Sequence, residues 1–208
     1  MNLLDKLAMV VPFTRLRAYE DVLKKHLGDA NTVLDIGCGE GRYKVFSHYV
    51  STGVDIDEPS LAKAKENGYY NKLYLRDITQ LKFNVRYDAI VSIQNIEHLT
   101  KEDGIKFLDK IEQYANKRII VMTTWGYFPF PAHDGNSFQE HKCGWLPTEF
   151  EKRGYKTFPI IYYRWRSNQS VFGLAIGYLL SIILRPLIKR NPEIYAQDFV
   201  AIKEIKSG

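Results

Sequence analysis

The residues best placed to do chemistry lie in the run VLDIGCGEG, residues 33–41, where an apolar stretch breaks into Gly37, Gly39 and Gly41. Glycine permits a sharp turn and lets the backbone approach a ligand without hindrance from a Cβ atom. Asp35 stands just before the glycines. Since the carboxyl ends of parallel strands form ligand sites, we expect a nucleotide-like ligand at the end of this strand.

The surrounding chain alternates short β-branched runs with helix-like stretches. The runs cover residues 32–36, 51–56, 72–78, 87–93 and 118–124. Strands separated by helical segments favour right-handed crossovers and a parallel, doubly wound α/β sheet. Residues 155–163 and 198–205 indicate two further strands.

Capping residues predict where the helices begin and end. One helix should follow the glycine loop, and a second should run from Pro59 to a left-handed stop at Asn67 and Gly68. A third opens at Thr100. A fourth should begin at Thr148, which would form a capping box with Glu151, and end at Gly154. An amphipathic helix is predicted over 13–27.

A nicotinamide dinucleotide is a weaker interpretation of the loop, because Arg42 occupies the position where a pyrophosphate-binding loop has its third glycine. The tighter spacing, with Asp35 before it, resembles motif I of class I S-adenosylmethionine-dependent methyltransferases. That resemblance covers about residues 30–123, with a weaker match over the last two strands. It implies a Rossmann-like doubly wound sheet of seven strands, mostly parallel with an antiparallel last strand, and helices on both faces.

The resemblance also implies how S-adenosylmethionine would be held. Asp35 orders the loop near the methionine part, and Asp55, next to Ile56, accepts from the ribose hydroxyls. Asp77 accepts from the adenine amino group, and Ile78 packs on the ring. Gln94, with Asn95, faces the floor of the pocket. The implied cofactor-binding set is Asp35, Gly37, Gly39, Gly41, Asp55, Ile56, Asp77, Ile78 and Gln94.

Residues 124–146 are richer in aromatic and hydrogen-bonding side chains than a simple turn requires, so we expect an acceptor-recognition loop there. Part of it, DGNSFQEH followed by GW, resembles a segment of methyltransferases associated with surface glycans. The expected acceptor is therefore a small-molecule or glycan/lipid-linked substrate, methylated at oxygen. His98, His133 and His141 are the candidate bases.

Two alternatives remain open at this point. Glu97 and His98, with His141 later, also resemble the metal-binding positions of small-RNA 2′-O-methyltransferases. The first glutamate of that pattern is Gln94 here. An amide binds a hard cation more weakly than a carboxylate, so we expect no metal and no nucleic-acid partner. The other alternative is a cofactor-binding module without catalysis.

Composition bounds the setting of the protein. The formal net charge of +5 favours an anionic partner, although most such charge is solvated. Cys38 and Cys143 fit no disulfide or metal framework, and no signal peptide is expected at the N-terminus, so we expect a cytoplasmic protein.

An apolar stretch lies near the C-terminus at 171–184, between basic residues. It is too short for a membrane span, and two interpretations remain. Either residues 171–188 contact the inner face of the membrane, or the helix packs on protein through a small-residue stripe of Gly173, Gly177 and Ser181.

We therefore expect one methyltransferase domain over 1–208. It divides into an N-terminal helical cap (1–29), a cofactor-binding core (30–123), the acceptor loop (124–146) and an apolar insertion (164–196). Oligomeric state has no signal in the sequence.

Overall fold

The computed structural model describes residues 15–80, 82–132, 137–160 and 171–205, with only part of the side chains in 171–195. The described residues group into two compact units. One unit comprises Asp29–Phe158 and the described part of Phe199–Gly208. The other comprises the described parts of Met1–Gly28 and Pro159–Asp198. All but one of the predicted site residues fall in the described part of the first unit, and the exception, His133, lies outside the described residues.

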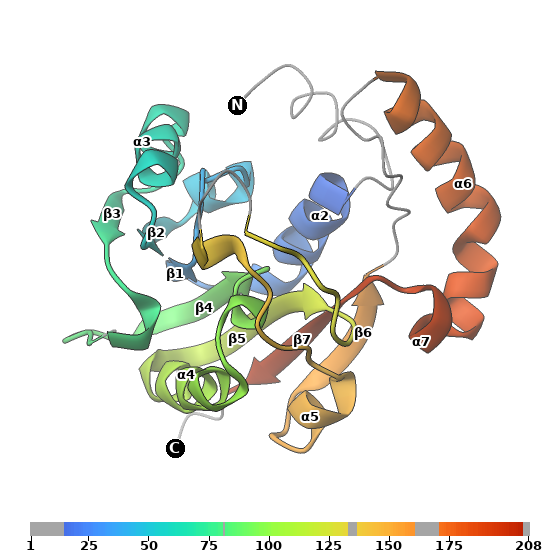
Figure 1. The fold of residues 1–208 in the computed structure, drawn as a ribbon. Helices are drawn as coiled ribbons and strands as arrows, with labels where there is room; N and C mark the ends of the chain where they lie inside the picture. The colour runs from blue at the N-terminus through green and yellow to red at the C-terminus, as the bar shows by residue number, and fades with distance from the viewer. Residues whose placement is uncertain (1–14, 81, 133–136, 161–170, 206–208) are drawn as a thin grey trace. The chain divides into compact units, whose positions relative to one another are not determined.

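A single seven-stranded sheet organises the fold, in the order β3-β2-β1-β4-β5-β7-β6 (Figure 1). Its strands are β1 (Thr32–Ile36), β2 (Val50–Asp55), β3 (Lys72–Leu75), β4 (Tyr87–Ile93), β5 (Ala115–Thr124), β6 (Lys156–Ile160) and β7 (Asp198–Glu204). The β3-β2-β1-β4-β5 part is parallel throughout, and β7 runs in the opposite direction. The predicted fold class is confirmed. The strand order reverses between β1 and β4, where ligands bind in sheets of this kind.

Two helices form where their capping residues predict them. Asp57 caps α3 (Glu58–Asn67) by accepting from the Ser60 N–H at 3.0 Å, and Gly68 ends it at a φ of 70°. Thr100 caps α4 (Lys101–Tyr114) by accepting from the Asp103 N–H at 3.2 Å. In Figure 1, α3 lies on one side of the sheet and α4 on the other, as predicted.

Two local predictions are wrong. The helix expected after the glycine loop is the short 3-10 helix η1 (Lys44–His48), because too little chain separates Gly41 from β2 for a full α-helix. The last helix of this unit, α5 (Pro147–Glu151), begins before Thr148. Proline is favoured in the first turn, and the Glu149 carboxylate, in place of Glu151, accepts from the Leu146 N–H at 2.8 Å.

The core of the first unit lies between the sheet and α4. Phe107, Leu108 and Ile111 of α4 are buried on the strands. Behind them, the ring of Phe150 contacts both Trp145 and Phe199, at centroid distances of 5.4 and 5.5 Å. Phe199 also contacts Trp125, at a centroid distance of 5.8 Å, so this packing anchors both ends of the acceptor loop.

The second unit contains α2 (Arg15–Leu27), α6 (Val171–Arg190) and α7 (Pro192–Tyr195). In α2, Tyr19, Leu23 and Leu27 are buried, and the Tyr19 hydroxyl donates to Asp198 at 2.5 Å. The apolar stretch forms α6, which continues past Leu184 and through Pro186. Within the described part of the chain, no helix combines the length and apolarity that a membrane crossing requires.

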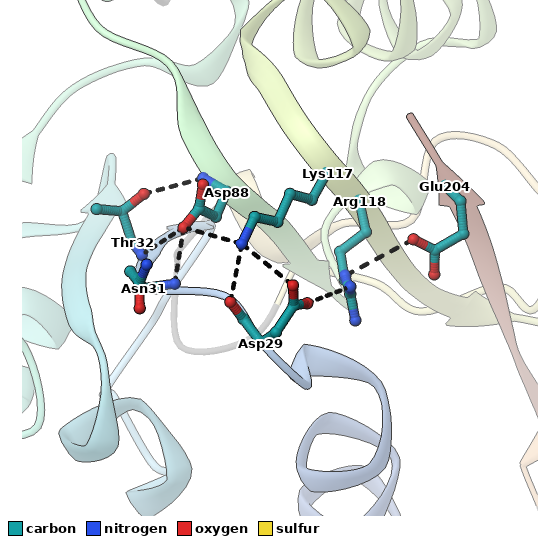
Figure 2. A network of polar contacts seen from close by, with 7 residues as sticks. All are labelled: Asp29, Asn31, Thr32, Asp88, Lys117, Arg118 and Glu204. Atoms are coloured by element: carbon teal, nitrogen blue, oxygen red, sulfur yellow. Dashed lines mark hydrogen bonds and ion pairs between the residues drawn. The ribbon is translucent and has the colours of Figure 1, made fainter. Parts of the chain in front are cut away.

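A network of charged groups joins the amino ends of β1, β4 and β5 to the carboxyl end of β7, which runs in the opposite direction (Figure 2). Lys117 donates to the backbone oxygen and the carboxylate of Asp29, at 2.9 and 3.2 Å, and lies 3.8 Å from Asp88. Arg118 donates to Asp29 at 2.6 Å and lies 3.7 Å from Glu204. The network ties β4, β5 and β7 to the segment that leads into β1.

Candidate functional site

The glycine loop and the ends of β2 and β4 surround one cavity of about 150 Å³. Three short 3-10 helices help to line it: η2 (Ile78–Gln80), η3 (Ile96–His98) and η4 (Ser137–Gln139). The lining residues are Gly37, Asp55, Ile56, Asp77, Ile78, Thr79, Asn95, His98, Leu99, Phe138 and Lys142. Five of the nine predicted cofactor residues are among them.

The glycine loop turns sharply at the start of the cavity. Gly37 has a φ of +74°, and its N–H donates to the Val54 carbonyl at 2.8 Å. A Cβ atom on Gly37 would lie 2.5 Å from Cγ of Asn95, so no other residue fits without a shift. Gly39 and Gly41 also have positive φ, but they support the loop without lining the cavity.

Asp55 holds the loop from the end of β2. Its carboxylate accepts from the Gly39 N–H at 2.7 Å and from the Asp57 N–H at 2.9 Å. A carboxylate has about four acceptor positions, so two hydrogen bonds leave capacity for hydroxyl donors of a ligand. Asp55 therefore both shapes the loop and faces the cavity.

Asp77 lines the cavity from the segment just after β3. One carboxylate oxygen accepts from the N–H and from the hydroxyl of Thr79, both at 2.8 Å. Ile78 is buried next to it and lines the cavity. Asp77 and Ile78 together offer a hydrogen-bond acceptor and an apolar surface, which suit the amino group and the ring of a heterocyclic amine.

Asp35 does not line the cavity but lies buried under the loop, with 2% of its surface exposed. One carboxyl oxygen accepts from the Tyr70 hydroxyl at 2.6 Å. Burial raises the pKa of Asp35 to about 7, the Tyr70 hydrogen bond opposes this, and the nearby charge of Asp55 adds to it.

The structure brings Asn95, rather than Gln94, to the cavity. Gln94 has a φ of 50°, which is rare for a residue with a side chain, and its N–H donates to the Met122 carbonyl at 2.7 Å. The Asn95 amide donates to the Ser92 hydroxyl at 3.2 Å and presses on Gly37. Strained backbone of this kind is common at binding sites.

Of the two candidate bases that the structure describes, His98 and His141, only His98 lines the cavity. Its Nδ1 lies 3.1 Å from the Glu140 carbonyl oxygen. Burial lowers the pKa of His98, against the raising effect of backbone hydrogen bonds to Glu140 and Gln94. The imidazole is therefore neutral at physiological pH, as a proton acceptor must be.

His141 lies behind His98, with 4.9 Å between the ring centroids, and its Nδ1 is 2.7 Å from the Phe128 carbonyl oxygen. Glu97 is buried next to them and accepts from the Thr123 hydroxyl at 2.8 Å. Ligand atoms of Glu97, His98 and His141 lie within 4.8 Å of one another, a spacing that would fit a metal ion. His133 lies outside the described residues.

Five contributors to the site were not predicted: Thr79, Leu99, Phe138 and Lys142, which line the cavity, and Tyr70 beneath the glycine loop. Lys142 and Phe138 come from the acceptor loop, where aromatic and charged residues are too frequent for the sequence to single them out. Tyr70 is 35 residues from Asp35 in the sequence, with the β1-β2 crossover and α3 between them, so no local pattern indicates that contact.

Residues 33–117 match the family model described as a methyltransferase domain. Among curated proteins, the chain is 26% identical over 145 residues to a ubiquinone biosynthesis O-methyltransferase of Rickettsia canadensis, covering 64% of this chain and 60% of that protein. It is 29% identical over 113 residues to a ribosomal protein L11 methyltransferase of Thermotoga maritima, covering 51% and 40%. The chain thus spans 60% or less of the length of these relatives.

Solved structures share the fold at low sequence identity. A magnesium protoporphyrin IX methyltransferase from Synechocystis with bound S-adenosylmethionine has a TM-score of 0.55 and 15% identity, covering 99% of this chain and 85% of that one. The methyltransferase domain of a bacterial protein, CtHen1, has a TM-score of 0.57 and 20% identity, covering 91% and 98%. The likeness shows that the chain shares the Rossmann-like fold of these proteins.

Proposed function

We propose that this chain, which carries a methyltransferase domain at residues 33–117 and has the class I fold, binds S-adenosylmethionine in the cavity described above and transfers its methyl group to an acceptor. The observation that carries the proposal is the convergence of Gly37, Asp55 and Asp77 on one cavity at the switch point of the sheet.

The residues present fit this cofactor. Gly37 brings backbone without a Cβ atom to the cavity, where a Cβ would clash with Asn95, and Asp55 and Asp77 offer acceptors to ribose hydroxyls and an adenine amino group. Among the described residues, no lysine or arginine forms an ion pair with either carboxylate. The cavity edge therefore keeps negative charge for a cationic ligand.

When bound, S-adenosylmethionine supplies a methyl group on a sulfonium, which a nucleophile displaces in line. The protein's part is to align the acceptor and exclude water, and Phe138, Leu99 and Ile78 provide apolar walls for this. A hydroxyl acceptor also needs a base, and neutral His98 is the side chain we assign to that role.

For the acceptor, we propose an oxygen of a small-molecule or glycan/lipid-linked substrate under the loop 124–146. Lys142, which lines the cavity on the acceptor-loop side, would suit an anionic group on such a substrate. The CtHen1 likeness is one of fold only and does not favour a particular substrate.

Labelled S-adenosylmethionine tests the proposal in extracts of a strain lacking the gene. Wild-type protein should transfer the label to a small-molecule or lipid fraction, and His98→Asn should lower turnover about 100-fold with little change in cofactor affinity. Tight cofactor binding without transfer to any fraction would instead support a module without catalysis.

The cluster of Glu97, His98 and His141 favours a second candidate, a metal-assisted RNA 2′-O-methyltransferase. In that case transfer to RNA would depend on an added divalent cation, and binding would weaken steeply with salt. Glu97→Gln would then remove the metal dependence together with the activity. Metal-independent transfer to a non-RNA fraction would rule this candidate out.

We further propose that α6 contacts an anionic membrane surface. Leu179, Ile182 and Ile183 are exposed on this helix at 57%, 46% and 66%, an unusual concentration of apolar surface. Arg185, Lys189 and Arg190 are exposed on the same helix. An apolar face with basic flanks suits the interface of an anionic bilayer, whereas a second copy of the same face would oppose like charges.

Sedimentation with vesicles of phosphatidylcholine and phosphatidylglycerol tests this contact. The double substitution Leu179→Asp and Ile183→Asp should abolish sedimentation, and pure phosphatidylcholine should bind weakly. The matched control, Val85→Asp with Ile105→Asp, also alters two exposed apolar residues but lies outside α6. Equal sedimentation of both double variants would contradict a contact through α6.

A further inference from the structure

Tyr70 lies in the turn between α3 and β3, which is clamped to the start of β2. The Asn71 N–H donates to the Ser51 carbonyl at 2.9 Å, and the Asn71 side chain accepts from the Ser51 N–H at 2.8 Å. The Ser51 hydroxyl donates to the Tyr69 carbonyl at 2.9 Å. With both neighbours fixed, the Tyr70 side chain has a defined direction.

The Tyr70 ring fills the space under the glycine loop. A Cβ atom on Gly41 would lie 2.8 Å from Cε2 of Tyr70, and one on Gly53 would lie 3.2 Å from its Cδ1. The ring also packs on Phe46 at a centroid distance of 5.3 Å. Tyr70 therefore touches the loop, β2 and the crossover that follows the loop.

The Tyr70 hydroxyl donates to the buried carboxyl of Asp35 at 2.6 Å. The other oxygen of Asp35 is buried and has no hydrogen-bond partner among the described residues. A buried carboxylate needs hydrogen bonds to remain charged, so the state of Asp35 depends on this single donor.

The ionisable groups that face the pair come from each neighbouring element. They are Asp55 on β2, Cys38 in the loop and Tyr43 after it. Burial raises the pKa of Asp35 to about 7, and the Tyr70 hydrogen bond holds it below the value it would otherwise reach. Burial raises the pKa of Tyr70 itself, so its hydroxyl remains a donor.

We propose that Tyr70 is a positioning residue for the cofactor: its ring sets the shape of the glycine loop, and its hydroxyl favours the charged form of the Asp35 carboxyl beneath that loop. This inference rests on the proposed function. A negative charge under the loop favours a ligand with net positive charge. S-adenosylmethionine carries such a charge, and its demethylated product S-adenosylhomocysteine does not. The Tyr70–Asp35 pair thus favours binding of the methyl donor over retention of the product.

Calorimetric titration with both ligands, from about pH 5.5 to pH 8.5, tests the pair. In the wild type, the preference for S-adenosylmethionine should rise through neutral pH as Asp35 ionises. Tyr70→Phe should weaken binding of the methyl donor about tenfold at neutral pH and move the midpoint of this rise to higher pH. Tyr74→Phe, a matched change at an exposed tyrosine of β3, should alter neither quantity.

If Tyr70→Phe binds the methyl donor more weakly but keeps the same pH midpoint, Tyr70 is only a packing residue and the proposal is overturned. Unchanged binding of the methyl donor would overturn it as well. Asp35→Asn should remove the pH dependence of the preference. If the wild type binds neither ligand, the proposed function fails, but the pair is still testable. NMR titration of the Asp35 carboxyl without ligand should give a higher pKa in Tyr70→Phe, and equal values would overturn the proposal.

Discussion

Carboxylates have different kinds of partner at the two ends of the sheet. At the amino ends, Asp29 and Asp88 lie against Lys117 and Arg118 (Figure 2). The hydrogen bond and charge of Lys117 lower the pKa of Asp29. These acids are satisfied by cations within the protein, so that end of the sheet fastens strands together.

At the carboxyl ends, Asp35, Asp55 and Asp77 accept only from hydroxyl and backbone N–H groups. In the described parts of the chain, none of the three forms an ion pair with lysine or arginine. Negative charge left uncompensated costs stability, and a ligand can offset that cost. The acids at the cavity end are therefore arranged for binding a ligand, and four variants test this contrast.

The largest effect is expected for Gly37→Ala. The added methyl group would lie 2.5 Å from Asn95 at a φ that disfavours alanine, so the loop must move. We expect cofactor affinity to fall at least about 100-fold, or ~3 kcal/mol, by calorimetry. Gly154→Ala is the matched control, because its φ of +82° imposes similar strain where the nearest atom is 4.0 Å away. Similar losses in both variants would count against a close approach at Gly37.

Asp35→Asn should make the protein more stable at alkaline pH. A pKa of about 7, raised from 3.8, means that the folded state binds more protons, so stability falls as pH rises from about 4 to beyond 7. Asparagine removes that charge but buries an amide group, so we expect a net gain of about 2 kcal/mol at pH 8 and little gain near pH 4. Urea unfolding at both pH values measures it. A loss of stability in Asp35→Asn at pH 8 would contradict the conclusion that the charged Asp35 carboxylate destabilises the folded protein.

Asp77→Ala should weaken binding of S-adenosylhomocysteine about tenfold, as expected when one hydrogen bond to a charged acceptor is lost. Asp103→Ala is the control, because Asp103 is a half-buried acid in the first turn of α4 that does not line the cavity. It should leave the affinity unchanged. Equal affinities of the wild type and Asp77→Ala would remove Asp77 from the site.

The smallest effect is expected for Asp29→Asn, which should not change cofactor affinity. Because the pKa of Asp29 is lowered in the folded protein, its contribution is present above about pH 4 and is lost as pH falls through the lowered value. The Tm should therefore fall slightly at pH 7 and match the wild type in acid. Altered cofactor affinity would show that the two ends of the sheet are coupled.

Local signals allowed much of the fold to be predicted from sequence. The caps at Asp57, Gly68 and Thr100 act within one turn, so the limits of α3 and α4 follow from neighbouring residues. The extent of η1 depends on how far the chain must travel to reach β2, and no neighbouring residue carries that information.

The site residues likewise divide into those that the sequence predicts and those that only the tertiary fold brings together. Gly37, Asp55 and Asp77 follow strands directly, so their place at the cavity was predictable. Asn95 lines the cavity as expected, but Gln94 does not, and residue type gives no warning of the positive φ at Gln94. Tyr70 meets Asp35 only through the tertiary fold.

Calorimetric titration of the purified protein with S-adenosylhomocysteine tests whether the cavity binds the cofactor, with a nicotinamide dinucleotide as the comparison. We predict saturable binding of one molecule per chain, weakened by ~1–3 kcal/mol in Asp55→Ala, and no binding of the dinucleotide. No detectable binding of S-adenosylhomocysteine or S-adenosylmethionine at about 1 mM would contradict the assignment of the cavity, whatever the acceptor.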